Sequence, residues 1–190
     1  MSGAFATLTV HDTLTLTTAA TVPNTAAVSF YVSAGSVIVD AGVHIYLDTT
    51  AVILQSGGTF STVAVAATPN VVTVHGGFYQ TGGTVTLGGA GTVGALHVTG
   101  NVQLGGGSLA SADVDSATGD SDRIAAEGRM EFGTAYTYDV VTVGVPLNTV
   151  FLPFYAKGGF VGGNRPTAAG YTVTVQQGAG NERWIQIKKN

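Results

Sequence analysis

Residues 82–107 read GGTVTLGGAGTVGALHVTGNVQLGGG, and this stretch decides the expected fold. Three short runs within it, at 84–87, 95–98 and 102–104, alternate apolar residues with small polar ones. Alternation with a period of two places successive side chains on opposite faces of a pleated strand. Only glycine-rich turns separate the runs, and no helix of ordinary length fits between them. The stretch therefore predicts short, closely spaced strands.

Internal echoes suggest how these strands are arranged. Val-Thr-Leu-Gly-Gly at 85–89 returns as Val-Gln-Leu-Gly-Gly at 102–106, and Gly-Gly-Thr at 57–59 returns at 82–84, so the echoes lie 17 and 25 residues apart. Such echoes are typical of a β-solenoid, in which each coil buries its inward residues against the next. Short strands with regular turns also suit a β-sandwich. The absence of Asn-Gly and Asp-Gly hairpin dipeptides favours the parallel β-helix-like solenoid.

The rest of the chain predicts further strands and three regions. Residues 5–18 alternate most regularly and form one long strand, or two joined at His11-Asp12. This segment serves either as the first coil or as a strand added to another subunit's edge. We expect an N-terminal strand region at 1–25, a solenoid body at 26–122 and a C-terminal β cap at 123–190. The other expected strands are at 28–32, 36–39, 43–47, 52–54, 62–66, 71–74, 124–126, 129–132, 138–143, 149–154, 171–176 and 184–188.

The expected cap is rich in aromatic residues. Nine of the sixteen aromatic side chains fall in the last 68 positions: Phe132, Tyr136, Tyr138, Phe151, Phe154, Tyr155, Phe160, Tyr171 and Trp184. A solenoid needs a covered end coil, and these bulky side chains can supply the cover. Residues 177–181, Gln-Gly-Ala-Gly-Asn, predict a hairpin loop between the last two strands.

Charge is sparse and unevenly placed. Charged residues make up 9% of the chain, and every Lys and Arg lies at or beyond Arg123. Residues 1–122 carry seven Asp and no base, and residues 123–190 carry four acids and seven bases, so the two parts have formal charges of −7 and +3. The bases either solubilise one end or allow head-to-tail stacking on an acidic body. Neutral faces of Thr, Ser, Ala and Gly favour association with further copies.

Composition also argues against several classes of protein. A chain without cysteine has neither disulfides nor thiolate metal sites. The first 20 residues show no basic region followed by a long apolar run, so we expect neither a secretory signal nor a membrane span. Seven bases beside an acidic body argue against nucleic-acid binding.

The C-terminal part resembles the end of an autotransporter-type passenger, a family of large right-handed β-helical proteins of bacterial surfaces. The resemblance covers about residues 80–190. It rests on Gly119-Asp120-Ser121-Asp122-Arg123-Ile124, Glu127-Gly128, Phe132-Gly133, Tyr138-Asp139-Val140-Val141, Gly158-Gly159-Phe160, Ala169-Gly170-Tyr171-Thr172-Val173 and Gly180-Asn181-Glu182. It implies an adhesive or structural role at the cell surface or outside the cell.

Candidate chemistry is limited, and we assign no catalytic, cofactor-binding or metal residue. The loop 113–122 holds four carboxylates that could bind calcium, but it lacks an EF-hand pattern, and a solvated polar loop is the favoured interpretation. Asp40 and Asp48 could form a hydrolytic pair, although turn formation alone explains an Asp at each position. The four histidines are His11, His44, His75 and His97, and none has the spacing of a metal pair within one element.

The sequence also contains repeated threonine pairs and two aromatic pairs. The Thr-x-Thr pairs at 7–9, 13–15, 84–86 and 172–174 resemble those of ice-binding solenoids but are scattered, so ordinary strand threonines are the favoured interpretation. Phe30-Tyr31 and Phe78-Tyr79 each point one ring outward, toward a sugar, a partner subunit or a covering turn.

The expected function is therefore that of a non-catalytic structural or adhesive surface module. It would assemble into a fibre, sheath or lattice, as a homo-oligomer or polymer formed through neutral β faces or strand addition. One alternative is a glycan-binding or glycan-cleaving β-helix, and another is a decoration or fibre protein of a virus particle.

Overall fold

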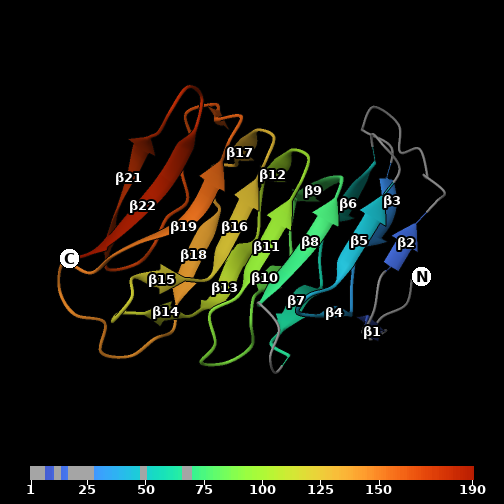
Figure 1. Ribbon diagram of the computed structural model, residues 1–190, viewed down its shortest axis with the longest axis horizontal. Coiled ribbons are helices and arrows are strands. Elements are labelled where there is room, and N and C mark those ends of the chain that lie inside the picture. Colours follow the sequence, from blue (N-terminus) through green and yellow to red (C-terminus); the bar gives the residue numbers. More distant parts are fainter. Residues whose placement is uncertain (1–6, 11–13, 17–27, 48–50, 66–69) are drawn as a thin grey trace.

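The computed structural model describes residues 7–10, 14–16, 28–47, 51–65 and 70–190, and all regular structure in these ranges is β (Figure 1). Sheet A contains, in spatial order, β1 (Thr7–Val10), β4 (Ser36–Asp40), β7 (Thr59–Val63), β10 (Thr84–Thr86), β13 (Ser108–Ala112) and β18 (Thr137–Val140). Sheet B contains β2 (Leu14–Leu16), β5 (His44–Leu47), β8 (Val71–His75), β11 (Ala95–Val98), β16 (Arg123–Ala126), β19 (Val150–Ala156), β22 (Arg183–Lys189) and β21 (Tyr171–Gln177). Sheet C contains β20 (Phe160–Val161), β17 (Met130–Phe132), β12 (Val102–Leu104), β9 (Gly77–Gln80), β6 (Val52–Gln55) and β3 (Val28–Val32).

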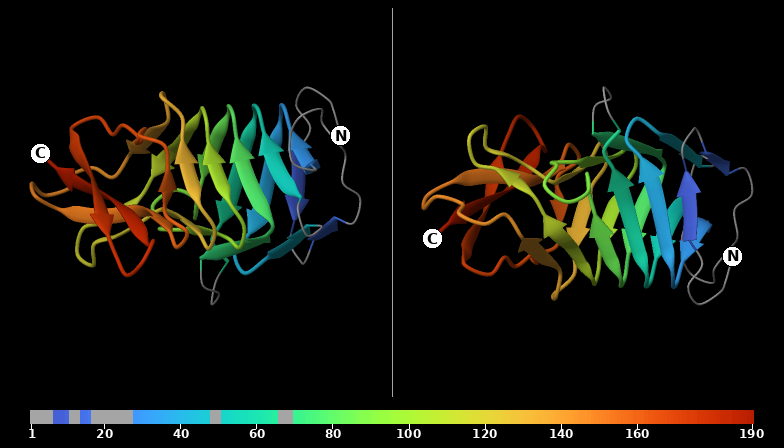
Figure 2. Two further views of the ribbon diagram at one scale, coloured as in Figure 1. Left: turned by 90° about the horizontal axis from the view of Figure 1, so that it is seen from above. Right: turned by 90° about the horizontal axis from the view of Figure 1, so that it is seen from below.

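From β1 to β20, apart from a short hairpin between β13 and β16, the chain visits sheets A, B and C in turn, and each visit adds a strand parallel to the previous one in that sheet. β10, for example, pairs in parallel with β7 on one side and β13 on the other. About four regular turns result, and Figure 2 shows their strands side by side in each sheet. The predicted β-solenoid is thereby confirmed. The described part of the N-terminal segment supplies two short strands, β1 and β2, which pair with β4 and β5 of the same chain.

A column of glycines forms the corner between sheets C and A. Four successive turns, at 33–35, 56–58, 81–83 and 105–107, have the same length and end in a glycine with positive φ: Gly35, Gly58, Gly83 and Gly107. The turns lie against each other, so that a Cβ on Gly83 would fall 2.6 Å from both the carbonyl carbon of Gly57 and the oxygen of Gly58. Only glycine fits this spacing. The Gly-Gly-Thr echo at 57–59 and 82–84 therefore marks equivalent positions in neighbouring coils.

Two buried glutamines tie this corner to the core. Gln55 and Gln80 face inward in register on β6 and β9. The Nε2 of Gln55 donates to the oxygens of Gly58 (3.3 Å) and Thr84 (2.9 Å), and the Nε2 of Gln80 donates to those of Gly83 (3.1 Å) and Ser108 (3.3 Å). Each side chain thus joins its own turn to the next coil. The Gly58 and Gly83 oxygens also accept the backbone N–H groups of Thr84 and Ser108, so each glutamine adds a second hydrogen bond to the corner.

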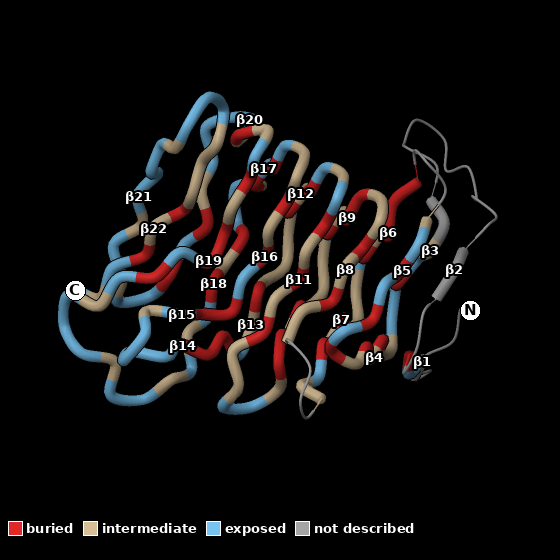
Figure 3. The backbone as a smooth tube through the Cα atoms, in the orientation of Figure 1, coloured by how far each residue is buried: buried red, intermediate tan, exposed pale blue. Residues whose placement is uncertain are grey.

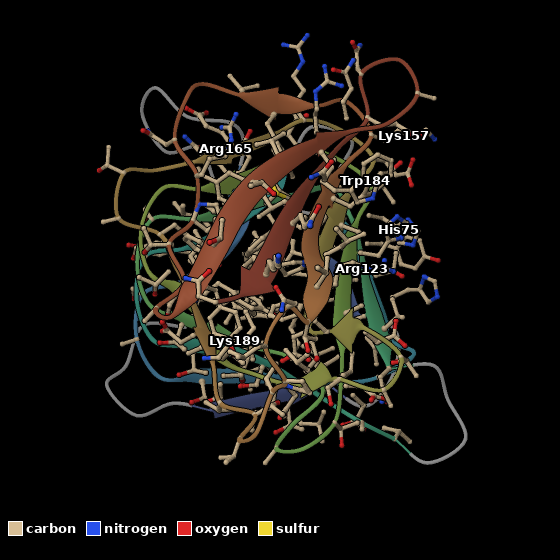
Figure 4. All side chains as sticks on the ribbon, turned by 90° about the vertical axis from the view of Figure 1, so that its left-hand side faces the viewer. His75, Arg123, Lys157, Arg165, Trp184 and Lys189 are labelled. Carbon is tan, nitrogen blue, oxygen red and sulfur yellow. The ribbon has the colours of Figure 1, made fainter. Side chains whose placement is uncertain are left out.

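The interior is apolar and ends in an aromatic cluster. Buried residues alternate with partly or fully exposed ones along many of the strands, as Figure 3 shows. At the C-terminal end the rings of Phe132, Tyr136 and Tyr138 contact Phe154, with edge-to-face contacts at 5.2 Å from Phe132 and 5.7 Å from Tyr138. Viewed from this end, the antiparallel hairpin of β21 and β22 passes in front of the coils (Figure 4). The predicted aromatic cap and its hairpin are confirmed.

Some local expectations were wrong. The echo of 85–89 at 102–106 is no coil repeat, because Val85 lies in sheet A and Val102 in sheet C. The strand expected at 62–66 begins at Thr59, immediately after the glycine corner, and ends at Val63. Its Thr62 faces inward, where its hydroxyl accepts a hydrogen bond from the Gly88 N–H at 2.9 Å. The strand β13 was missed because its small residues, Ser-Leu-Ala-Ser-Ala, carry little β signal.

Candidate functional site

The acidic loop 113–122 divides into two inward and two outward carboxylates. β14 (Val114–Asp115) and β15 (Asp120–Ser121) form a short antiparallel hairpin, which leaves Asp115 and Asp120 exposed. Asp113 and Asp122 are buried at its base. Because the four side chains point in different directions, they form no shared calcium cage. The described residues contain no cluster of three or more His, Cys, Asp or Glu side chains arranged to hold a metal ion.

Asp122 fastens the base of the hairpin to the solenoid. Its carboxylate accepts hydrogen bonds from the backbone N–H groups of Gly94 at 2.8 Å and Asp113 at 3.1 Å. Asp113 in turn accepts one from the Gly91 N–H at 2.8 Å. Burial raises the pKa of Asp122 to about 7, outweighing the two amide hydrogen bonds, and the nearby Asp113 raises it further. Asp113 and Asp122 therefore have a structural role, because their hydrogen bonds hold the base of the hairpin against the turn that contains Gly91 and Gly94.

Asp122 should make folding depend on pH. The protonated side chain is favoured in the folded state, so the contribution of Asp122 to stability is greatest below its unfolded pKa of 3.8 and decreases as pH rises toward 7. We expect the free energy of unfolding of the native protein, minus that of Asp122→Asn, to be larger at pH 5 than at pH 8, by on the order of 2 kcal/mol. Urea denaturation at both pH values measures this difference.

The matched control for this comparison is Asp120→Asn, which changes an exposed carboxylate in the same hairpin. The free energy of unfolding of the native protein, minus that of Asp120→Asn, should stay nearly constant between pH 5 and pH 8. If the corresponding difference for Asp122→Asn is equally independent of pH, or grows toward pH 8, the pKa of Asp122 is not raised in the folded protein.

A groove of about 890 Å³ lies between this hairpin and the outer face of sheet B. Asp115 and Asp120 line one side, and Arg123 lies at the start of β16. Trp184 and Gln186 project from β22 on the far side. The groove thus combines carboxylates, a guanidinium, amides and an indole.

An aromatic and ionic strip follows the outer face of sheet B. His44 Nδ1 lies 2.9 Å from His75 Nε2, and the rings of Tyr46 and His75 stack with centroids 4.2 Å apart. Further along, Glu127 contacts His97 at 3.2 Å and Lys157 at 2.7 Å. Lys157 and then His97 hold the pKa of the Glu127 carboxyl below its ordinary value.

Strand pairing brings together two histidines that lie far apart in the sequence. Tyr46 and His75 are register partners on β5 and β8, which places His44 beside His75 although 31 residues separate them in sequence. Burial, and then His44 and His97, lower the pKa of His75. His11 lies outside the described residues.

The remaining candidates are dispersed. Tyr31 is 51% exposed on sheet C, where its hydroxyl bonds Ser56 Oγ at 2.8 Å, and Phe78 is buried beside an outward Tyr79. Asp40 ends β4, and Asp48 lies outside the described residues, so no hydrolytic pair can be placed. Of the Thr-x-Thr pairs, Thr84 and Thr86 align with Thr59 and Ser61 on β7, in outward hydroxyl columns that the scattered spacing did not reveal.

Comparisons with known proteins give this chain no relatives. Neither a protein-family model, nor a curated protein, nor a solved structure matches it. Within the ranges that the structure describes, no helix has the length and apolar character needed to cross a bilayer.

Proposed function

We propose that this protein is a non-catalytic structural or adhesive module that assembles with further copies of itself into a fibre, sheath or lattice. The observation that carries the proposal is the outer edge of β21 (Tyr171–Gln177). Among the described residues, this seven-residue strand pairs only with β22, so one side of its backbone is open. Its sequence, YTVTVQQ, contains no charge and no proline. Such an edge is a template for pairing with another chain.

The hydrogen-bond pattern identifies the groups on that edge. Asn190 donates its N–H to the Gly170 oxygen and Gly178 donates to the Glu182 oxygen, so even-numbered residues of β21 bond to β22. In an antiparallel ladder the alternate residues direct their N–H and C=O groups to the other side. The N–H groups of Val173 and Val175 therefore point to the open edge.

The opposite end of the stack offers complementary edges. Of the described strands there, β1, β2 and β3 each pair with one neighbour only. The formal charge of −7 on residues 1–122 and +3 on residues 123–190 favours contact between opposite ends of two copies. Head-to-tail addition through sheet B would repeat without closing and build a filament.

Blocking the β21 edge should prevent assembly. Val175 is 39% exposed, and Val175→Lys places a charge on this edge. We expect the concentration needed for polymerisation to rise at least about tenfold, which corresponds to about 1.4 kcal/mol per contact. Val175→Pro, which removes an outward N–H, should act in the same direction. Sedimentation and electron microscopy measure the assembly.

The matched control is Val143→Lys, which makes the same substitution at a side chain that is 95% exposed in the loop after β18. It should assemble like the native protein. Native protein that stays dispersed and monomeric at high concentration would refute the proposal. So would polymers that form unchanged in both Val175 variants.

The proposal also includes the cellular location of the protein. We propose an extracellular or cell-surface location, as in autotransporter-type passengers. Support comes from the parallel β-solenoid, the aromatic C-terminal end and the order of the glycine-rich motifs over residues 80–190. Surface labelling of intact source cells with antibodies to the purified protein tests the location.

A further inference from the structure

The groove beside the β14–β15 hairpin has a lining that self-assembly does not explain. Four amide side chains border it, together with the charged and aromatic groups described above: Asn70, Gln176, Gln177 and Gln186. Val150 and Leu152 expose 40% and 39% of their surface, and both belong to the groove. Its volume of about 890 Å³ lies within the usual range of ligand sites, about 300–1,000 Å³.

We propose that this groove binds a neutral oligosaccharide. A sugar chain presents hydroxyls, which both donate and accept hydrogen bonds, around faces of C–H groups. Amides supply donors and acceptors together, and carboxylates accept from hydroxyls. Indole and aliphatic surfaces suit the C–H faces. The lining offers these groups in one continuous hollow.

The charges of the lining select against acidic ligands. Asp115 and Asp120 face one guanidinium, that of Arg123, and the described lining has no other Lys or Arg. The Ala117 N–H donates to Asp115 at 2.9 Å, and this bond lowers the pKa of the carboxyl. Asp115 is therefore ionised at neutral pH. A sulfated, sialylated or uronic-acid chain would meet net negative charge, whereas a neutral chain would not.

The groups that would contact the sugar are held in place before binding. The Trp184 ring lies 5.3 Å from that of Tyr155, whose hydroxyl donates to Glu182 at 3.1 Å. Gly178 leaves room for the indole, since a Cβ there would lie 2.1 Å from its Cζ3 atom. Figure 4 shows Arg123 and Trp184 on the same side of the molecule. A prearranged site loses less entropy on binding.

The direct experiment is an array of neutral, uronic-acid-containing, sialylated and sulfated oligosaccharides, followed by calorimetry with the best neutral binder. We expect neutral chains to bind, and Trp184→Ala to weaken the affinity at least tenfold. Asp120→Ala, on the exposed hairpin, should weaken it severalfold and keeps the test valid if Trp184→Ala does not fold. Tyr31→Ala, on sheet C and outside the groove, should bind like the native protein.

Three results would overturn the proposal. They are an absence of binding to every glycan, binding restricted to acidic glycans, and neutral binding that neither Trp184→Ala nor Asp120→Ala weakens. Assembly measured on the same samples separates this proposal from the proposed function. Trp184 and Asp120 are not on the β21 edge, so polymerisation should persist when glycan binding is lost.

Discussion

Gly83→Ala should destabilise the protein by about 3–5 kcal/mol, although it adds a single methyl group. The new Cβ would lie 2.6 Å from the Gly57 carbonyl carbon and the Gly58 oxygen, both of which belong to backbone. Relief requires the coils to separate. Separation would strain the hydrogen bonds from the Thr84 N–H to the Gly58 oxygen at 2.9 Å and from the Thr81 N–H to the Gln55 oxygen at 2.7 Å.

Gly89→Ala separates this steric effect from the cost of a positive φ. Gly89 has φ +82°, close to the +77° of Gly83, but a Cβ there meets nothing within 4 Å. We expect Gly89→Ala to lower the free energy of unfolding by only about 1–2 kcal/mol, the ordinary cost of a left-handed conformation for a non-glycine residue. Urea denaturation of both variants gives the comparison. Equal losses would show that close contact between turns does not stabilise the corner.

Phe154→Ala should cost about 3–5 kcal/mol, because it opens a cavity at the centre of the aromatic cluster. The ring is fully buried and meets Phe132 at 5.2 Å, Tyr138 at 5.7 Å and Tyr136 at 6.1 Å. Phe132 lies on β17 and the two tyrosines lie in or directly before β18, so these rings are held by two strands and cannot easily collapse into the space. The change should also loosen β22, whose Ile185 is the register partner of Phe154.

Phe154→Leu is the graded control for this prediction. It retains most of the apolar volume, so we expect a loss of about 1–1.5 kcal/mol. Thermal and urea denaturation, with near-ultraviolet circular dichroism to report on the aromatic packing, distinguish the variants. If Phe154→Ala lowered the free energy of unfolding less than Phe154→Leu does, the cluster would not be the main stabilising element of the C-terminal end.

The solenoid could be predicted from the sequence because its corner leaves a local signature. Gly58 and Gly83 must be glycine wherever turns lie against each other, and the same two-residue alternation flanks both. The cap could be predicted from composition, since nine of the sixteen aromatic residues fall in the last 68 positions. The coils upstream bury fewer rings, among them Phe60 and Phe78.

The outer surfaces could not be predicted, because they depend on register between coils. His44 and His75 are 31 residues apart, whereas Gly58 and Gly83 are 25 apart, so no single period aligns both pairs. The groove depends in the same way on strands far apart in sequence. Asp122 appeared to belong to a solvated loop, but long turns leave backbone N–H groups that need acceptors, and this carboxylate satisfies two of them.

The turns of the solenoid differ in their tolerance of added residues. Those from sheet C to sheet A keep one length at 33–35, 56–58, 81–83 and 105–107, whereas those from sheet A to sheet B grow from 41–43 to 87–94 and 113–122. Residues added to a turn from sheet A to sheet B leave the strands before and after that turn in register. A foreign peptide grafted beside Gly89 would therefore be displayed without disturbing the scaffold. If the proposed self-assembly occurs, the graft would recur once per subunit as a regularly spaced array.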